Sequence, residues 1–208
     1  MTYVPRHFEI KDQGGSHRLI EESNFGMLIT SGSGVLEVSH LPFVLDKDRG
    51  SLGHLRCHVA KANPIWRAIE AGPLLAVFSG PHAYISPHWY PNPNLVPTWN
   101  YTAAYVHGRG RLMDGDALDQ LLLDLSNAEE ARITNKEPWS VADVPETSYA
   151  PMRQAIVGID IEITQIEGKA KMSQNRGKDD QAGVVKGLQG LGTSNALAVA
   201  ALVEGINA

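Results

Sequence analysis

The chain has 208 residues, with 18 basic and 23 acidic side chains, a formal net charge of −5 and one cysteine. A dedicated DNA-binding domain is usually basic, so this balance argues against direct DNA binding, and one cysteine excludes an internal disulfide framework. No apolar run reaches the ~18 residues that span a bilayer, and the charged N-terminus does not resemble a signal peptide. We therefore expect a single domain over residues 1–208, no membrane segment, and a reducing, cytoplasmic setting.

The first half of the chain predicts mainly β structure. A short helix is expected near 16–24, followed by strands over 25–30 and 34–46. The turn-forming segment 46–50 and the alternating segment 51–60 predict a hairpin. Further strands are expected over 72–80, continued by 82–86 beyond a proline, and over 98–113, where Gly108 and Gly110 predict bends or bulges.

The second half begins with the clearest helix signal. Four leucines recur at the spacing of one helical face, namely Leu118, Leu121, Leu122 and Leu125. Asp114 or Asp116 is a suitable N-cap for this helix.

The remaining segments suggest the architecture. Residues 135–151 are expected to form a loop, 155–168 a β-branched strand, and 179–189 and 194–205 two helices, with Ser194 capping the second. About six strands with short connections favour antiparallel pairing, and closure into a barrel removes exposed edges. The predicted class is mainly β with helices (α+β), with a helical extension over 179–208 packed on the barrel.

Two polar turns are candidate anion sites. In "HVAKANPIW" (58–66), Lys61 lies beside the turn dipeptide Asn63-Pro64, where backbone NH groups can bind an anion. In "KMSQNRGK" (171–178), four hydrogen-bonding side chains end in Arg176, whose planar fork suits phosphate. An ordinary solvated turn is the alternative interpretation of both.

A ring-rich stretch, "GPHAYISPHWY" (80–90), is the third candidate. With the segment 96–101 it contributes Tyr84, Trp89, Tyr90, Trp99 and Tyr101. Such rings can stack on a flat aromatic ligand, form a dimer interface, or belong to the core.

Other sites have little support in the sequence. The chain lacks HExxH, CxxC, GxSxG, Walker A and strand–GxGxxG–helix motifs, so we predict no metal site and assign no catalytic residue. Cys57 is expected to be a small buried hydrophobe. Whether the protein is an enzyme stays open.

Nine sequence blocks, in order along the chain, resemble the PaiB family of FMN-binding negative transcriptional regulators. They are "YVPRHF" (3–8), "SHLPFVLD" (39–46), "HVAKANPIWR" (58–67), "GPHAYISPHWY" (80–90), "VPTWNY" (96–101), "GRGRL" (108–112), "AIVGIDIEIT" (155–164), "IEGKAKMSQNR" (166–176) and "GVVKGL" (183–188). The resemblance covers residues 1 to about 200. It implies a six-stranded antiparallel split β-barrel of the FMN-binding type and a homodimer with FMN at the subunit interface.

The resemblance also implies which residues contact FMN. It places the strand with Ser39, His40 and Leu41 beneath the flavin ring. The side chains of His58, Lys61 and Asn63 are implied on the phosphate side. Gln174 or Arg176 is expected to reach the cofactor, from the same or the other subunit. The ring-rich segments would complete the flavin-binding site through Tyr84, Ser86, Trp89 and Trp99.

Three functions are compatible with these features. The first is an FMN-binding protein of the transcriptional-regulator type that acts indirectly or through its flavin. The second is a flavin-dependent oxidoreductase on a small molecule, since the cofactor itself would carry the redox chemistry. The third is a haem-binding split-barrel protein, in which His82, His88 or His107 would supply the axial ligand.

Overall fold

The structure is a computed structural model that describes residues 2–91, 94–133 and 135–207. The chain forms two compact units. Unit 1 comprises Met1–Glu22, Ser79–Tyr105 and Glu167–Ala208, and unit 2 comprises Ser23–Phe78 and Val106–Ile166. That the whole chain is a single domain stays a prediction.

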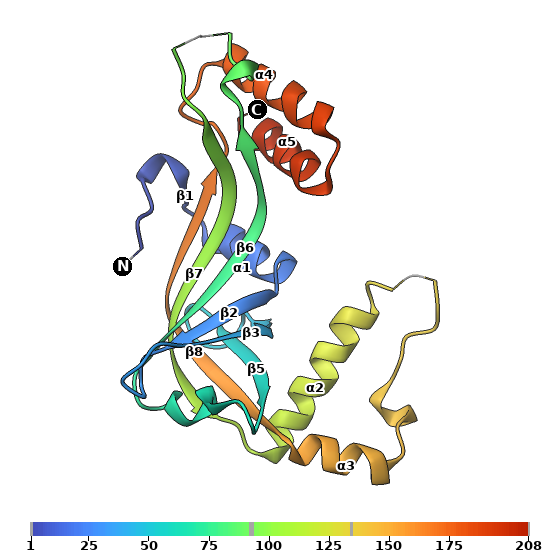
Figure 1. Ribbon diagram of the computed structural model, residues 1–208. Coiled ribbons are helices and arrows are strands. Elements are labelled where there is room, and N and C mark those ends of the chain that lie inside the picture. The colour runs from blue at the N-terminus through green and yellow to red at the C-terminus, as the bar shows by residue number, and fades with distance from the viewer. Residues whose placement is uncertain (1, 92–93, 134, 208) are drawn as a thin grey trace. The chain divides into compact units, whose positions relative to one another are not determined.

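An antiparallel sheet forms the framework of unit 2. Its own strands are β2 (Phe25–Thr30), β3 (Glu37–Pro42), β4 (Val44–Asp46) and β5 (His54–Ala60). Three long strands, β6 (Pro73–Ile85), β7 (Thr98–Leu112) and β8 (Ile156–Lys171), each contribute one part to each unit. The order along the sheet is β3-β2-β6-β7-β8-β5-β4 (Figure 1).

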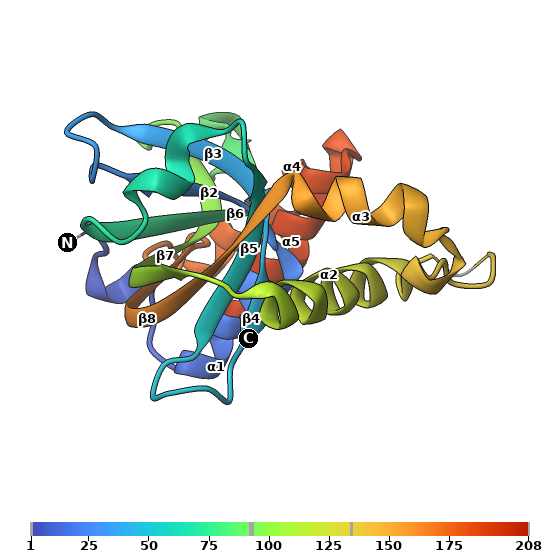
Figure 2. The same cartoon turned by 90° about the horizontal axis from the view of Figure 1, so that it is seen from below.

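Pairing in unit 2 follows the alternation of apolar residues. The predicted hairpin is confirmed, because β4 pairs antiparallel with β5 and Asp46 lies opposite His54. On its other side β5 lies next to β8 (Figure 2). In this pair Cys57 lies opposite Ile159. Both of these side chains are fully buried, so they form part of the interior.

Two helices and two short 3-10 turns complete unit 2. These are η2 (Pro64–Ala68), α2 (Gly115–Glu130), η4 (Val141–Asp143) and α3 (Glu146–Gln154). The predicted cap of α2 is confirmed, since Asp114 Oδ1 accepts a 2.9 Å hydrogen bond from the Ala117 backbone N. Of the predicted leucine stripe, Leu118 and Leu121 are buried and the other two are half-buried.

In unit 1, helices cover the ends of the long strands. The unit contains η1 (Arg6–Phe8), β1 (Glu9–Ile10), α1 (Gln13–Glu22), η3 (Pro87–Trp89), α4 (Lys178–Leu191) and α5 (Ser194–Asn207). The two C-terminal helices lie side by side (Figure 1). Their apolar side chains, such as Val184 and Val199, form one core with Ile85 of β6 and Met172 of β8.

Several predicted elements were wrong in detail. The described residues form eight strands, not about six. The expected strand 34–46 is interrupted between β3 and β4, where Pro42 has no NH and the Phe43 ring packs on Phe78 at 5.2 Å. The expected strands 72–80 and 82–86 are one continuous strand, β6, despite Pro81.

Two helix predictions also need correction. The expected loop 135–151 contains most of α3, which tolerates Pro151 because Arg153 binds Asp119 and the Gly115 carbonyl of α2. The cap of α5 is Thr193, not Ser194, since Thr193 Oγ1 accepts from the Ala196 backbone N at 3.3 Å. Among the described residues, no helix is long and apolar enough to cross a bilayer.

Candidate functional site

A polar turn follows β5 in unit 2 and is tied to β3. The Nδ2 atom of Asn63 donates a 2.8 Å hydrogen bond to the Oγ atom of Ser39. The Oδ1 atom of Asn63 accepts from the Ile65 backbone N at 3.1 Å and so caps η2. The structure therefore brings together two predicted site residues that lie 24 positions apart in the sequence.

His58 lies three residues before Lys61, on β5. Its Nδ1 atom is buried, and no described residue hydrogen-bonds to it. Burial lowers the pKa of His58, so the neutral imidazole is favoured near pH 7. A buried ring nitrogen without a hydrogen-bond partner is costly unless a ligand or water supplies one, so this atom is a candidate ligand contact.

Hydrogen bonds of its backbone fix the position of Lys61, whereas its side chain is exposed. Its backbone N donates to the Ala155 carbonyl at 2.8 Å, and its carbonyl accepts from the Trp66 indole Nε1 at 3.0 Å. No hydrogen bond or ion pair of the Lys61 side chain is found within the described residues. The ammonium group is thus available to an anion beside the turn.

The three predicted residues of β3 do not share one face. Successive side chains alternate across a strand, so Ser39 and Leu41 face one side and His40 faces the other. Leu41 is buried, whereas His40 is exposed and stacks on Phe25 with ring centroids 6.3 Å apart. Side-chain contacts to one ligand are therefore open to Ser39 and Leu41 together, but not to all three.

The ring cluster of unit 1 divides into two environments. Tyr84 and Trp99 are 46% and 53% exposed, and their rings meet edge to face at 6.1 Å. Trp89, in contrast, packs on α4 at Gly183 and Gly187, and Tyr90 is buried in the core. The core interpretation therefore holds for one part of the cluster, while the other part is an exposed aromatic surface.

Other predicted contacts in unit 1 are already engaged locally. The Ser86 hydroxyl accepts from the His88 backbone N at 3.3 Å and caps η3. Gln174 accepts from the Met172 backbone N at 2.7 Å and donates to the Ala170 carbonyl at 2.5 Å, so it holds its own turn. Arg176 keeps its guanidinium 5.6 Å from the centre of the Tyr90 ring.

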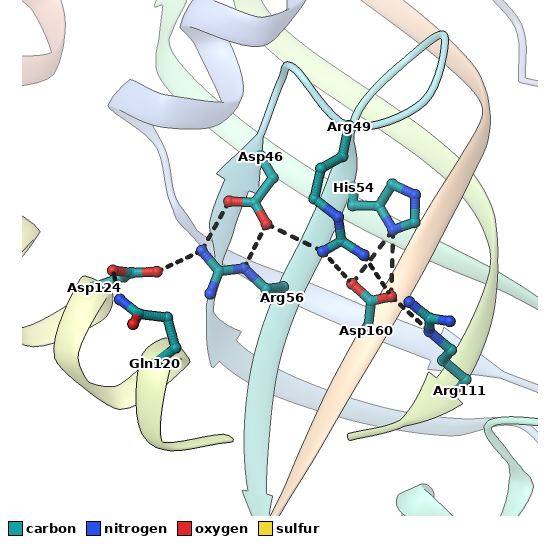
Figure 3. Close-up of polar contacts among 8 residues, drawn as sticks. All are labelled: Asp46, Arg49, His54, Arg56, Arg111, Gln120, Asp124 and Asp160. Carbon is teal, nitrogen blue, oxygen red and sulfur yellow. Dashed lines mark hydrogen bonds and ion pairs between the residues drawn. The ribbon is translucent and has the colours of Figure 1, made fainter. Parts of the chain in front are cut away.

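A charged cluster in unit 2 was not predicted from the sequence. Figure 3 shows Arg49, His54 and Arg111 converging on Asp160. The closest contacts are 2.9 Å from Arg49 Nη1, 2.8 Å from Arg111 Nε and 3.3 Å from His54 Nδ1. These contacts fasten β8 to the turn after β4 and to β7.

The same view shows a second ion-pair group beside the first. Arg56 lies between Asp46 and Asp124, with its Nη2 atom 2.7 Å from a carboxylate oxygen of each. A cavity of about 340 Å³ adjoins both groups. One feature of the sequence could have indicated these ion pairs. Each of two apolar strands contains a charged residue, Arg56 in β5 and Asp160 in β8, and a buried charge needs a partner.

The residues around the turn after β5 fit an anionic group such as a phosphate. They offer a cation, an amide, a hydroxyl and an unsatisfied imidazole nitrogen, which are all groups that bind phosphate oxygens. Among the described residues, no group of three or more His, Cys, Asp or Glu side chains could hold a metal ion. Two of the three candidate haem ligands, His82 and His88, are exposed, and His107 is half-buried.

The sequence matches one family of proteins and several relatives. Residues 2–165 match the family described as "Putative FMN-binding domain". The chain is 32% identical over 203 residues to Protease synthase and sporulation protein PAI 2 of Bacillus subtilis, covering 97% of this chain and 96% of that protein. It is 33% identical over 226 residues to an uncharacterized protein of Emericella nidulans, covering 90% of each.

Solved structures share the fold at low sequence identity. Flavocytochrome Anf3 of Azotobacter vinelandii aligns with a TM-score of 0.60 at 15% identity, over 87% of this chain and 78% of that one. The FAD and heme binding protein of Mycobacterium smegmatis aligns with a TM-score of 0.58 at 13% identity, over 84% and 78%. The predicted split-barrel class, mainly antiparallel β with helices, is confirmed.

Proposed function

The chain belongs to the PaiB-type family of FMN-binding proteins, and from this membership we propose that it binds FMN and acts as a flavin-dependent or indirect regulator. The regulatory part of the proposal is supported by the name of the Bacillus subtilis relative, a protease synthase and sporulation protein. The net charge of −5 favours an indirect action over direct DNA binding. We also propose a cytoplasmic location, on the single cysteine.

The FMN phosphate is bound by the turn after β5. The observation that carries this proposal is the buried, unsatisfied Nδ1 of His58, three residues before the exposed Lys61. Lys61 contributes the charge, His58 contributes a ring nitrogen, and the Asn63–Ser39 hydrogen bond fixes the turn. Ser39 and Leu41, which share a face of β3, contact the flavin ring.

Bound FMN would supply one- and two-electron redox chemistry. Tyr84 and Trp99 form an exposed aromatic surface of unit 1 and stay predicted flavin contacts. Arg176 also stays a predicted contact, from the same or the partner subunit. Four further residues stay predicted flavin contacts, although each already interacts with neighbouring protein groups: His40, Ser86, Trp89 and Gln174. None of these residues is assigned a catalytic role.

A matched pair of variants tests the phosphate assignment. Lys61→Gln should weaken FMN binding by about 10- to 150-fold, because a charge-assisted contact contributes about 1.5–3 kcal/mol. Riboflavin, which lacks the phosphate, should bind wild type and Lys61→Gln equally. Lys136→Gln, at an exposed position of the same unit, is the control. Equal FMN affinity in wild type and Lys61→Gln, measured by quenching of flavin fluorescence, would exclude this site.

The protein is proposed to act as a homodimer with FMN at the interface. The exposed rings of Tyr84 and Trp99, with Val96 at 68% exposure, form a surface of the composition found at interfaces. Light scattering coupled to gel filtration should give twice the monomer mass, and Trp99→Glu should give the monomer. A monomeric wild type at micromolar concentration contradicts the dimer.

Two alternative functions have specific support. A flavin-dependent oxidoreductase is favoured by the cofactor chemistry itself. In a steady-state assay it would oxidise a reduced nicotinamide and pass the two electrons to an added acceptor such as dichlorophenolindophenol. A haem protein is favoured by the names of the two structural neighbours, a flavocytochrome and an FAD and heme binding protein. Absorption spectra during titration with FMN or haemin separate a flavin protein from a haem protein.

A further inference from the structure

Two lysines at the C-terminal end of β8, in unit 1, are largely shielded from solvent. Lys169 and Lys171 lie two residues apart, so their side chains leave the same face of the strand. Lys169 is only 6% exposed and Lys171 is half-buried. Buried lysines are rare unless an anion compensates the charge.

The surroundings of the two ammonium groups contain rings and neutral oxygens. The Lys169 Nζ atom donates to the Tyr3 carbonyl at 3.2 Å and lies 5.0 Å from the centre of the Tyr101 ring. The Lys171 Nζ atom donates to Thr98 Oγ1 at 2.5 Å and lies 5.9 Å from the Phe8 ring. Cation–π contacts offset only part of the cost of removing an ammonium group from water.

No carboxylate in the described part of the chain pairs with either lysine. Glu167, two residues before Lys169 on the same strand, accepts a hydrogen bond from the Thr2 backbone N at 3.2 Å. Burial lowers the pKa of Lys171, Tyr101 partly offsets this, and the positive charges of Lys169 and Arg176 lower the pKa further. Lys171 therefore lies near two further cations, Lys169 on the same strand face and Arg176 in the turn after β8.

The third cation, Arg176, is presented by a rigid turn. Ser173 adopts a left-handed conformation with φ of 60°, which is strained for a residue with a side chain. Its hydroxyl accepts a 3.0 Å hydrogen bond from Asn100, which is fully buried. Gln181 donates to the carbonyls of Ser173 at 3.1 Å and Arg176 at 2.9 Å, so both ends of the turn are fixed.

We propose that Lys169, Lys171 and Arg176 form a binding site for the phosphate group of a small-molecule ligand. A phosphate dianion would supply the counter-charge that no carboxylate provides to the two ammonium groups. Its oxygens can also accept two parallel hydrogen bonds from the planar guanidinium group of Arg176. The site goes beyond the proposed FMN-phosphate turn of unit 2, and only Arg176 is common to both assignments. The phosphate can come from FMN itself or from a separate phosphate ester.

Thermal unfolding with inorganic phosphate tests the site. The test uses the full-length Lys61→Gln protein, which removes the other candidate phosphate contact, with phosphate compared against chloride at equal ionic strength. Phosphate should raise the Tm of this protein, and adding Lys171→Met should remove the increase. Lys171→Met should also raise the Tm without phosphate by about 2–4 °C, because it removes an uncompensated buried charge.

A control and a second variant keep the test decisive. Lys186→Met removes an exposed lysine of α4 and should change neither Tm. Lys169→Met should repeat the result of Lys171→Met without touching the Thr98 hydrogen bond. If both methionine variants lower the Tm without phosphate and respond to phosphate as their parent does, the lysines are structural and the proposal is wrong. An absent phosphate effect in the parent protein also overturns it.

A flavin titration then identifies the source of the phosphate. If Lys171→Met loses FMN affinity but keeps riboflavin affinity, the site binds the phosphate of FMN. If FMN affinity is unchanged while the phosphate effect is lost, the site belongs to another phosphorylated ligand. The effect of Lys61→Gln on FMN, measured separately, reports the proposed FMN site, so failure of one assignment is distinguishable from failure of the other.

Discussion

Asn63 reaches across from the turn after β5 to the Ser39 hydroxyl on β3, at 2.8 Å. The same side chain caps η2 through the Ile65 backbone N. One amide therefore fixes both the position of the turn and the start of the following 3-10 turn. The side chains of Lys61 and Asn63 depend on this geometry for any ligand that they bind together.

Substitution of Asn63 should separate these two roles. Asn63→Ala removes the cap and the link to β3, so we expect a loss of about 1–2 kcal/mol in the free energy of unfolding and about 10-fold weaker FMN binding. Ser39→Ala removes the link but keeps the cap, so its stability loss should be smaller. Urea denaturation and FMN titration measure the two effects. Unchanged FMN affinity in both variants would place the phosphate elsewhere.

Local patterns predicted most of the strands, because each depends on residues that are neighbours in the sequence. The alternation of β5 and the β-branched run of β8 are examples. The glycines of β7 show the limit of such patterns. A Cβ atom at Gly108 would lie 2.5 Å from the Ile161 Cγ2 atom, so this glycine is required by close packing between strands rather than by its own turn propensity.

Features that depend on distant residues were not predicted. Asp160 lies 111 positions from Arg49 and 49 from Arg111, and no spacing rule connects them. The helix α3 was missed because Pro145 and Pro151 indicate a loop, whereas its contact with α2 favours the helix. For the candidate site, the resemblance indicated both Ser39 and Asn63, but only the structure shows their hydrogen bond.

The packing of Trp89 on α4 gives a second prediction. A Cβ atom at Gly187 would overlap the indole ring, which is too large to move aside without repacking. Gly187→Ala should therefore lower the free energy of unfolding by about 1–3 kcal/mol, although alanine favours a helix. Differential scanning calorimetry measures the change.

Gly190 provides a matched control on the same helix. Nothing lies within 4 Å of a Cβ atom placed there, so Gly190→Ala should raise stability by about 0.5–1 kcal/mol. If both alanine variants raise stability, the contact between Trp89 and α4 does not constrain the fold.

The buried thiol of Cys57 gives a third prediction. Its side chain is 0% exposed, and burial raises its pKa, so the reactive thiolate is disfavoured. A thiol reagent such as DTNB should label the folded protein only at the rate of unfolding, and should label urea-unfolded protein quickly with one equivalent. Fast stoichiometric labelling of the folded protein would contradict the buried position.

The ion-pair cluster of Figure 3 predicts a stability that depends on pH. Burial raises the pKa of Asp160, but hydrogen bonds from Arg49 and Arg111 outweigh it and leave the pKa below its ordinary value. A carboxylate with a lowered folded-state pKa stabilises the fold above its unfolded pKa of about 3.9, and this contribution is lost as the pH falls through the folded pKa. Asp160→Asn should therefore cost about 1.5–3 kcal/mol at pH 7.

The difference between wild type and Asp160→Asn should shrink as the pH is lowered below about 4, because the wild-type carboxyl group becomes protonated and uncharged. Asp48→Asn removes an exposed carboxylate from the turn that holds Arg49, and it should leave the free energy of unfolding unchanged at both pH values. Urea unfolding at pH 7 and at pH 3 measures both differences. A difference between wild type and Asp160→Asn that stays constant over this range would mean that the side chain acts through its shape and neutral hydrogen bonds rather than through its charge.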